Sequence, residues 1–160
     1  MLHHVSVGVR DVERAAKFYD PVLKTLGYRR VMEFLPYAIG YGETRDRPEF
    51  WIQLPHNKQP ASVGNGVHVA FLAKNKAVVD KFHTQALKQG GSNGGEPGPR
   101  PDYTPSYYGA FTFDLDGNKL EAMLMVLVKD VAKTAAKKPA RKAKAKTAKK
   151  AGRAKKKSRR

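Results

Sequence analysis

Apolar and polar residues alternate at the start of the chain. In residues 2–9, three valines are separated by polar or small residues, which is the two-residue period of a β-strand with one buried face. Asp11 then occupies a helix N-cap position, and apolar residues recur at helical spacing up to Gly27. Pro21 lies inside this segment and predicts either a kink or a restart of the helix with proline at its first position.

Three strand candidates follow the first helix. They are residues 28–34, 37–41 and 50–54, and each is short and rich in aromatic or β-branched residues. Together with the first strand and the helix they form a unit of the order strand, helix, strand, strand, strand.

The same order of patterns occurs a second time, at a constant offset of 64 residues. Residues 66–91 align with residues 2–27 without a gap, and His68 falls on His4. Two copies of one supersecondary unit, each too small to bury its apolar face alone, are expected to pack together.

The second unit contains a strand at residues 67–72, a helix capped by Asn75, and a final hairpin. The two strands of the hairpin are predicted at residues 107–113 and 119–127, joined by a turn rich in Asp and Gly. The stretch 94–105 is dense in Gly and Pro, so it predicts a loop, which is either a cover beside the site or only a connector.

These patterns predict an α+β fold, in which two βαβββ units pair with each other. We assign residues 1–130 to this domain, with units at about 1–60 and 65–128, and residues 131–160 to a tail.

The basic charge of the chain is concentrated at its C-terminal end. The formal net charge is +17, yet residues 133–160 hold 15 of the 31 Lys and Arg residues and no acidic residue. A Lys-, Ala- and Arg-rich segment without large apolar side chains is predicted to be disordered, and its composition resembles that of linker-histone tails.

Such a tail would bind DNA or RNA through phosphates, without sequence preference, or would serve only as a solubilising appendage. The cations expected to contact nucleic acid are spread along it: Lys137, Lys138, Arg141, Lys142, Lys149, Lys150, Arg153, Lys155, Lys156 and Lys157.

Composition excludes some classes of function. The chain has no cysteine, which excludes disulfides, zinc ribbons and thiol nucleophiles. No apolar run approaches the roughly 20 residues needed to cross a bilayer, so no membrane partner is expected. We expect a cytoplasmic protein, which the basic tail would associate with the nucleoid.

Three polar residues stand in strands where apolar residues are expected, namely His4, His68 and Glu121. Two imidazoles and one carboxylate from three strands would make a facial triad suited to Fe(II), Mn(II), Zn(II) or Ni(II). The alternative is a pair of strand histidines hydrogen-bonded to each other, to Glu121 or to water, without a metal. His56 and His83 are predicted to be surface residues.

The chain resembles the vicinal oxygen chelate superfamily, which groups glyoxalase I, bleomycin resistance proteins and extradiol dioxygenases. The resemblance covers residues 2–126 and rests on motifs such as His-His-Val-Ser-Val-Gly-Val, Lys-Phe-Tyr-Asp-Pro-Val-Leu, Gly-Val-His-Val-Ala-Phe and Asp-Leu-Asp-Gly-Asn-Lys-Leu-Glu-Ala. It implies that the two units form a curved mixed sheet around a central cup, with metal ligands facing the cup at His4, His68, Glu121 and the position of Trp51. Family members often form dimers, so a homodimer is one expected assembly.

The resemblance implies a small oxygen-rich or aromatic ligand in the cup. The pocket residues that we predict are Ser6, Trp51, Gln53, Ala70, Phe111 and Met123. The function would be that of a divalent-metal lyase, isomerase or dioxygenase, or that of a metal-free module that sequesters or senses a ligand, as bleomycin resistance proteins do. Trp51 departs from the ligand residue of glyoxalase I, so the reaction type stays open.

Overall fold

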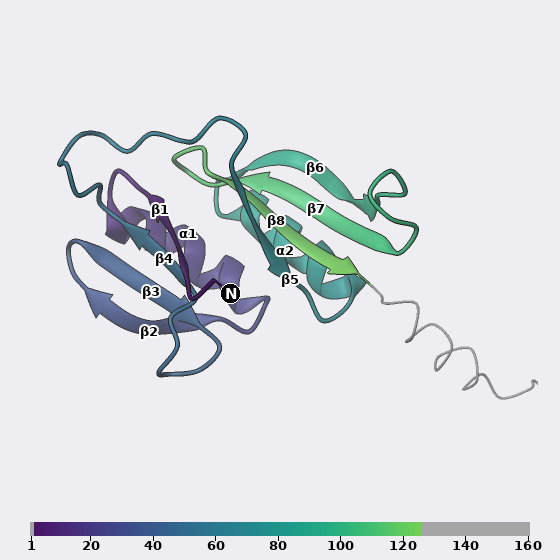
Figure 1. Cartoon of the computed structure of the whole chain (residues 1–160), viewed down its shortest axis with the longest axis horizontal. Coiled ribbons are helices and arrows are strands. Elements are labelled where there is room, and N and C mark those ends of the chain that lie inside the picture. The colour runs from purple at the N-terminus through teal and green to yellow at the C-terminus, as the bar shows by residue number, and fades with distance from the viewer. Residues whose placement is uncertain (1, 126–160) are drawn as a thin grey trace, which may run out of the picture.

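The computed structural model describes residues 2–125 of the chain (Figure 1). Its elements in chain order are β1 (Val5–Gly8), α1 (Val12–Lys24), β2 (Arg29–Phe34), β3 (Ala38–Gly42), β4 (Phe50–Gln53), β5 (His68–Leu72), α2 (Lys76–Lys88), β6 (Ser92–Pro99), β7 (Tyr107–Phe113) and β8 (Lys119–Met125). Two βαβββ units therefore follow one another, and the predicted α+β fold is confirmed.

None of the helices in residues 2–125 has the length and apolar character needed to cross a membrane. The predicted basic tail lies outside the described residues.

The repeat seen in the sequence is kept in the helices. Both helices contain 13 residues, and the second begins and ends 64 positions after the first. Their N-caps repeat as well, because Asp11 accepts a hydrogen bond from the backbone N–H of Arg14 at 2.7 Å and Asn75 accepts one from Val78 at 3.1 Å. Each cap satisfies a backbone donor that would otherwise lack a partner in the first turn.

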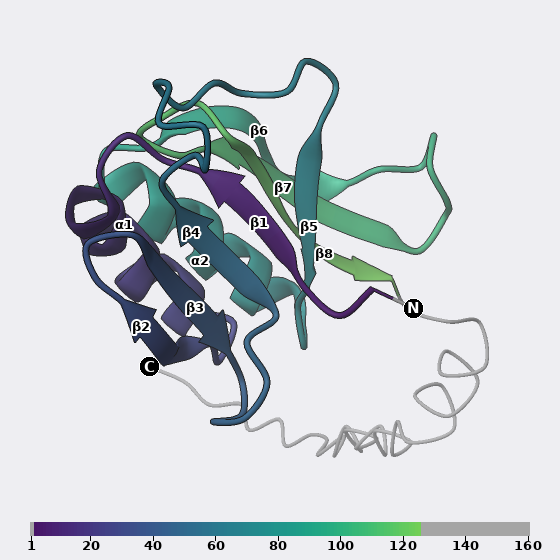
Figure 2. The same cartoon turned by 60° about the vertical axis from the view of Figure 1, so that its left-hand side comes forward.

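Each unit forms its own four-stranded mixed sheet, and the two sheets have the same topology (Figures 1 and 2). The strand orders are β1-β4-β3-β2 and β5-β8-β7-β6, with β1 parallel to β4 and β5 parallel to β8. Ser6 pairs with Trp51 in the first sheet, and Ala70 pairs with Glu121 in the second. Because Ser6 and Ala70 are 64 residues apart, Trp51 and Glu121 occupy equivalent positions.

One face of each sheet packs on a helix and carries the apolar side chains of the core. In β4, for example, Phe50 and Ile52 are buried while Trp51 and Gln53 point to the other side. We call the side without a helix the open face of each sheet. It carries Ser6, Gly40, Trp51 and Gln53 in the first unit, and His68, Ala70, Phe111, Glu121 and Met123 in the second.

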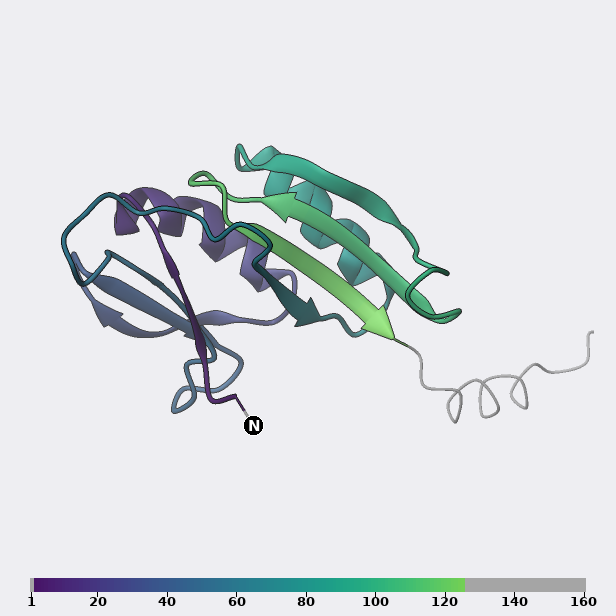
Figure 3. The same cartoon turned by 45° about the horizontal axis from the view of Figure 1, so that its top comes forward.

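The two units share one hydrophobic core. Figure 3 shows the units side by side, each with its helix on one face of its sheet. Phe50 of the first unit meets Phe71 of the second edge to face, with ring centroids 5.2 Å apart. The turn between β7 and β8 adds polar contacts, because buried Asp114 accepts a hydrogen bond from the Tyr19 hydroxyl at 2.6 Å. Asn118 in the same turn donates to the carbonyl oxygen of Gly8 at 3.0 Å. The relative placement of the units is thus held by the core and by this turn.

The first helix continues through Pro21, so the predicted restart of the helix at this residue is wrong. Proline lacks the N–H that would bond to the residue four positions earlier, and this costs one bond in the last turns of the helix. Tyr19 before Pro21 and Val22 after it are fully buried, so core packing on both sides of Pro21 holds the segment helical.

The prediction of a loop at residues 94–105 is wrong over its first half, because Ser92–Pro99 forms edge strand β6. Its glycines permit close packing: a Cβ on Gly94 would lie 3.0 Å from the ring of Phe113. Register shifts at Asn93/Gly95 and Gly95/Gly98 absorb the irregular residues. An edge strand tolerates proline because one side of its backbone pairs with no neighbour.

Candidate functional site

Glu121 is a carboxylate on the open face of the second sheet, and it is only 1% exposed. The hydroxyl of Tyr107 donates to its Oε1 at 2.7 Å. The Nε2 atom of His68 lies 3.2 Å from its Oε2, while the His68 side chain itself stays 43% exposed. Both carboxylate oxygens therefore have a polar partner, as burial of a charged group requires.

The surroundings of Glu121 are closely packed. Gly109 makes room for the carboxylate, since a Cβ at this position would lie 2.9 Å from Oε1. Phe111 pairs with Glu121 across the strands, and its ring is 6.1 Å from that of His68. The ammonium group of Lys119 covers the Phe111 ring at 4.8 Å. These side chains separate Glu121 from solvent and hold it in one position.

Burial raises the pKa of the Tyr107 hydroxyl well above its usual value, and the hydrogen bond and charge of Glu121 raise it further. Tyr107 therefore remains a protonated donor at neutral pH. Its role as the partner of Glu121 was not evident from the sequence, because the two residues are on different strands and strand tyrosines commonly have packing roles.

His4 does not join His68 and Glu121. Its Nδ1 lies 2.9 Å from that of His3, and its ring lies edge-on to Trp51 at 6.4 Å. Over residues 2–125 no group of three or more His, Cys, Asp or Glu side chains is placed to share a metal ion. The structure thus assembles two of the three predicted ligands. The reason is that no strand pairing joins β1 to β5 in this part of the chain, so the two histidine strands belong to separate sheets.

Two donors, with both oxygens of the carboxylate already engaged, do not fit a divalent metal ion. Catalytic sites for such ions commonly take three protein ligands and leave a position open for water or substrate.

The open face of the first sheet carries an aromatic surface in place of the carboxylate. Trp51 lies flat across Gly40, where a Cβ would come within 2.9 Å of three indole atoms. Phe34 stacks beside it with ring centroids 6.0 Å apart and planes inclined by 14°. We call Phe34, Trp51 and His4 the aromatic shelf. Phe34 is 56% exposed, so a flat apolar surface is accessible to solvent.

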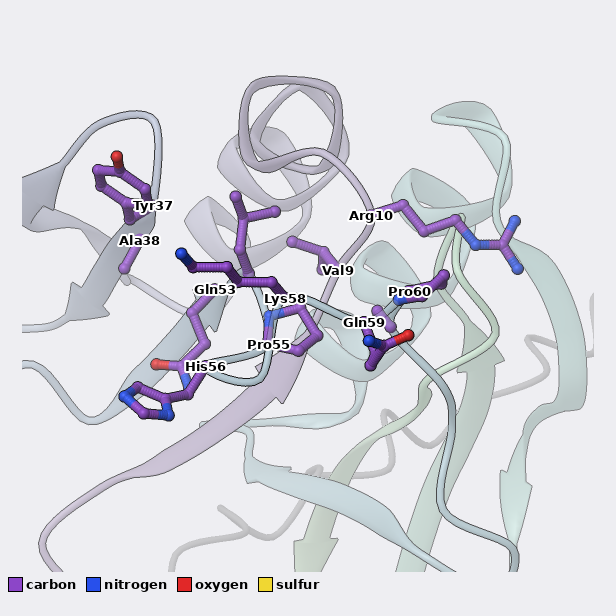
Figure 4. Close-up of a pocket in the computed structure, with 12 residues that line it drawn as sticks. Val9, Arg10, Tyr37, Ala38, Gln53, Pro55, His56, Lys58, Gln59 and Pro60 are labelled. Atoms are coloured by element: carbon purple, nitrogen blue, oxygen red, sulfur yellow. The ribbon is translucent and has the colours of Figure 1, made fainter.

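The predicted pocket residues fall into two groups. Ser6, Trp51 and Gln53 share the open face of the first sheet, whereas Ala70, Phe111 and Met123 share that of the second. In the first group, Gln53 also lines a cavity at the end of β4 (Figure 4). In the second group, Phe111 is 7% exposed because it packs against its neighbours.

Two further residues of the site were not predicted from the sequence. Strand pairing brings Phe34 and Gly40 close to Trp51, and no sequence motif marks either residue.

His83, predicted to be on the surface, is 3% exposed, and its Nε2 lies 3.0 Å from Asn93 Oδ1. That prediction is wrong. The signal for burial was the four-residue spacing from Val79, which places His83 on the apolar face of α2.

Comparisons with known proteins agree with this architecture. A family model described as the Glyoxalase/Bleomycin resistance protein/Dioxygenase superfamily matches residues 1–122. A crystal structure of a glyoxalase/bleomycin resistance protein from Albidiferax ferrireducens T118 is 36% identical, with a TM-score of 0.70 over 79% of this chain and 99% of that one.

Two further relatives are more distant. The uncharacterized protein YqjT of Bacillus subtilis (strain 168) is 29% identical over 97 residues, which is 56% of this chain and 71% of that protein. A lactoylglutathione lyase from Agrobacterium tumefaciens is 18% identical with a TM-score of 0.53, covering 78% of this chain and 92% of the other, and shows likeness of fold alone.

Proposed function

Since the chain belongs to the Glyoxalase/Bleomycin resistance protein/Dioxygenase superfamily, we propose that it binds a small planar molecule, aromatic or oxygen-rich, on the open face of its first sheet. The observation that carries this proposal is the aromatic shelf. Trp51 and Phe34 present nearly parallel rings, and an exposed aromatic surface gains free energy when a flat ligand stacks on it and displaces water.

We place the ligand on the first sheet because the carboxylate on the open face of the second sheet is buried. Glu121 is covered by its own partners, His68 and Tyr107, and neither carboxylate oxygen is available to a ligand without breaking a contact. The shelf has no such cover, as the exposure of Phe34 indicates. Binding without a metal ion is therefore the function that the geometry of one chain supports best.

A fluorescence titration tests this proposal, because Trp51 is the only tryptophan in the chain. We expect at least one compound in a panel of planar aromatic and oxygen-rich molecules to quench Trp51 saturably, and the quenching to persist in excess chelator. Replacement of Phe34 by Leu should weaken binding about fivefold, which is the usual scale for loss of one aromatic contact. Leu87→Ala, on the exposed side of α2, is the control and should bind normally. Loss of quenching on addition of chelator would count against the proposal.

Metal-dependent lyase, isomerase or dioxygenase chemistry is the competing function. The 3.2 Å approach of His68 to Glu121 favours it, while the lack of a third donor in residues 2–125 speaks against it. Elemental analysis of protein purified without chelator and without a metal-affinity tag decides between the two. We expect no stoichiometric Fe, Mn, Zn or Ni; one ion per chain that disappears in His68→Ala would reverse this conclusion.

The basic tail supports a second activity, non-specific binding of DNA or RNA. Its 15 Lys and Arg residues at positions 133–160 would release counterions from phosphates. The full chain should bind a random-sequence duplex with an affinity that falls steeply with salt, and deletion of residues 133–160 should remove that affinity. A truncated chain that binds DNA equally well would exclude this role of the tail.

A further inference from the structure

A second feature of the first sheet adjoins the aromatic shelf, namely a cavity of about 880 Å³ at the end of β4 (Figure 4). It lies where the segment of residues 54–61, which leaves the sheet, turns back over the end of β1. The segment comes close to β1 at Gly8, because a Cβ on Gly8 would lie 3.4 Å from the Cβ of Ala61 and 3.7 Å from Pro55. The segment therefore closes one side of the cavity and the sheet closes another.

The polar lining of the cavity is basic or neutral. Arg10, His56 and Lys58 contribute nitrogen-bearing groups, and Gln53 and Gln59 contribute amides. In the part of the chain that the structure describes, no Asp or Glu belongs to the lining. The remaining lining is largely Val, Ala, Leu and Pro side chains. A site with this composition favours a ligand that has an apolar body and a negatively charged group.

The cations of the lining are not equivalent. The Arg10 guanidinium is 3.8 Å from Asp116 and extends away from the other two in Figure 4. Within residues 2–125, the ammonium group of Lys58 is paired with no carboxylate. Figure 4 shows its side chain passing over Gln53 toward Tyr37. Lys58 is thus the cation best placed to receive an anionic group.

The backbone of Lys58 is held in an unusual conformation. Its φ is +61°, in the left-handed region that residues with a side chain rarely adopt. Two hydrogen bonds hold it there: the Lys58 N–H donates to the carbonyl of Pro55 at 3.0 Å, and the Gln59 N–H donates to Asn57 Oδ1 at 3.0 Å. Strain of this kind persists where the surrounding structure enforces it, and it is frequently associated with ligand sites.

Gln53 connects the cavity to the aromatic shelf, because it lines the cavity and neighbours Trp51 on β4. Trp51 and Gln53 lie on the same face of β4, two residues apart, which corresponds to about 7 Å along the strand. Across the strands, Gly40 pairs with Trp51 and Ala38 pairs with Gln53. A small residue therefore lies next to each of these two side chains. One small molecule can therefore reach from the shelf into the cavity.

We infer that the ligand of this face is an aromatic carboxylate, with its ring on Trp51 and its acid group, on a short chain, in the cavity beside Lys58. This inference rests on the proposed function, and it adds the charge and shape of the ligand. Gln53 also lines the cavity, and its amide N–H groups can donate to the carboxylate.

The probes for the test are 3-phenylpropionate and its neutral amide, titrated into the full chain and followed by NMR. The indole N–H of Trp51 and the side-chain amide of Gln53 report the two ends of the site. We expect the acid to bind about fivefold more tightly than the amide, as for one solvent-accessible ion pair. Lys58→Gln should remove this difference, Lys58→Arg should keep it, and Lys81→Gln, a matched change on α2, should leave it unaltered.

The outcomes separate this inference from the proposed function. Equal binding of acid and amide, with no effect of Lys58→Gln, overturns the anionic site and leaves stacking on Trp51 intact. A charge preference without shifts at Trp51, insensitive to Phe34→Leu, overturns stacking on the shelf and with it the placement of the ring. If neither probe shifts Trp51 or Gln53 at millimolar concentration, an aryl carboxylate is not the ligand.

Discussion

At the scale of single residues, the two sheets carry different side chains at one equivalent position. The first unit places Trp51 there and the second places Glu121. A glycine makes room in both cases: Gly40 lies under the indole and Gly109 lies beside the carboxylate. The same backbone position thus serves an exposed aromatic surface in one unit and a buried polar cluster in the other.

The hydrogen bond from Tyr107 to Glu121 should contribute measurably to stability. Tyr107→Phe leaves Oε1 of a buried carboxylate without its donor, which costs about 1–3 kcal/mol of unfolding free energy. Urea denaturation measures this change. Tyr103→Phe, at an exposed tyrosine whose ring contacts that of Tyr107, is the control and should change stability by less than about 0.5 kcal/mol. Equal effects of the two substitutions would mean that the hydrogen bond is not formed.

At the scale of elements, the two units use the same local devices. Each helix begins with a side chain that accepts a hydrogen bond from the third helical residue, and each helix packs one face on its sheet. The outer strands differ more, since β2 has one register shift and β6 has two. The helices are therefore the better-preserved part of the repeat, and the outer strands are where the units have diverged.

Removal of either helix cap should have a similar effect. Asp11→Ala and Asn75→Ala each leave a backbone N–H without its acceptor and should lower the unfolding free energy by about 1 kcal/mol. Thermal unfolding followed by circular dichroism measures both. Asp46→Ala, at an exposed position between strands, should have little effect. A large difference between the two caps would show that the halves contribute unequally to stability.

At the scale of the whole molecule, one core ties the units together, and three tyrosines that lie in it or pack against it are close to carboxylates. Burial, aided by Asp114, raises the pKa of Tyr19 well above its usual value. Burial likewise raises the pKa of Tyr41, next to Asp20, and raises that of Tyr28 to about 12, next to Glu49. In each case the folded protein favours the neutral phenol, because a phenolate would be poorly solvated and close to a carboxylate.

These shifts predict that the protein loses stability in alkaline solution. The unfolded chain releases its phenol protons near pH 10, while the folded chain retains them, so the stabilisation is complete below about pH 10. It is lost as the pH rises through the raised folded values. Urea unfolding between about pH 8 and about pH 12 should show this fall, and Tyr41→Phe should make it shallower. Stability that stays constant up to about pH 12 would contradict the prediction.

The sequence by itself determined the repeat, the helices with their caps, and most strands. These features arise from interactions between residues close in the chain, and alternation, capping and the offset of 64 residues record them directly. The position of Glu121 on a polar strand face could be predicted for the same reason.

Only the tertiary structure decided which side chains meet. Pairing with β7 made a strand of the Gly- and Pro-rich segment, and packing of α2 buried His83. The separation of β1 from β5 kept His4 away from His68, while the approach of Tyr107 and His68 engaged Glu121 on both oxygens. Such contacts join residues far apart in the chain and depend on the relative placement of whole elements, which no local pattern records.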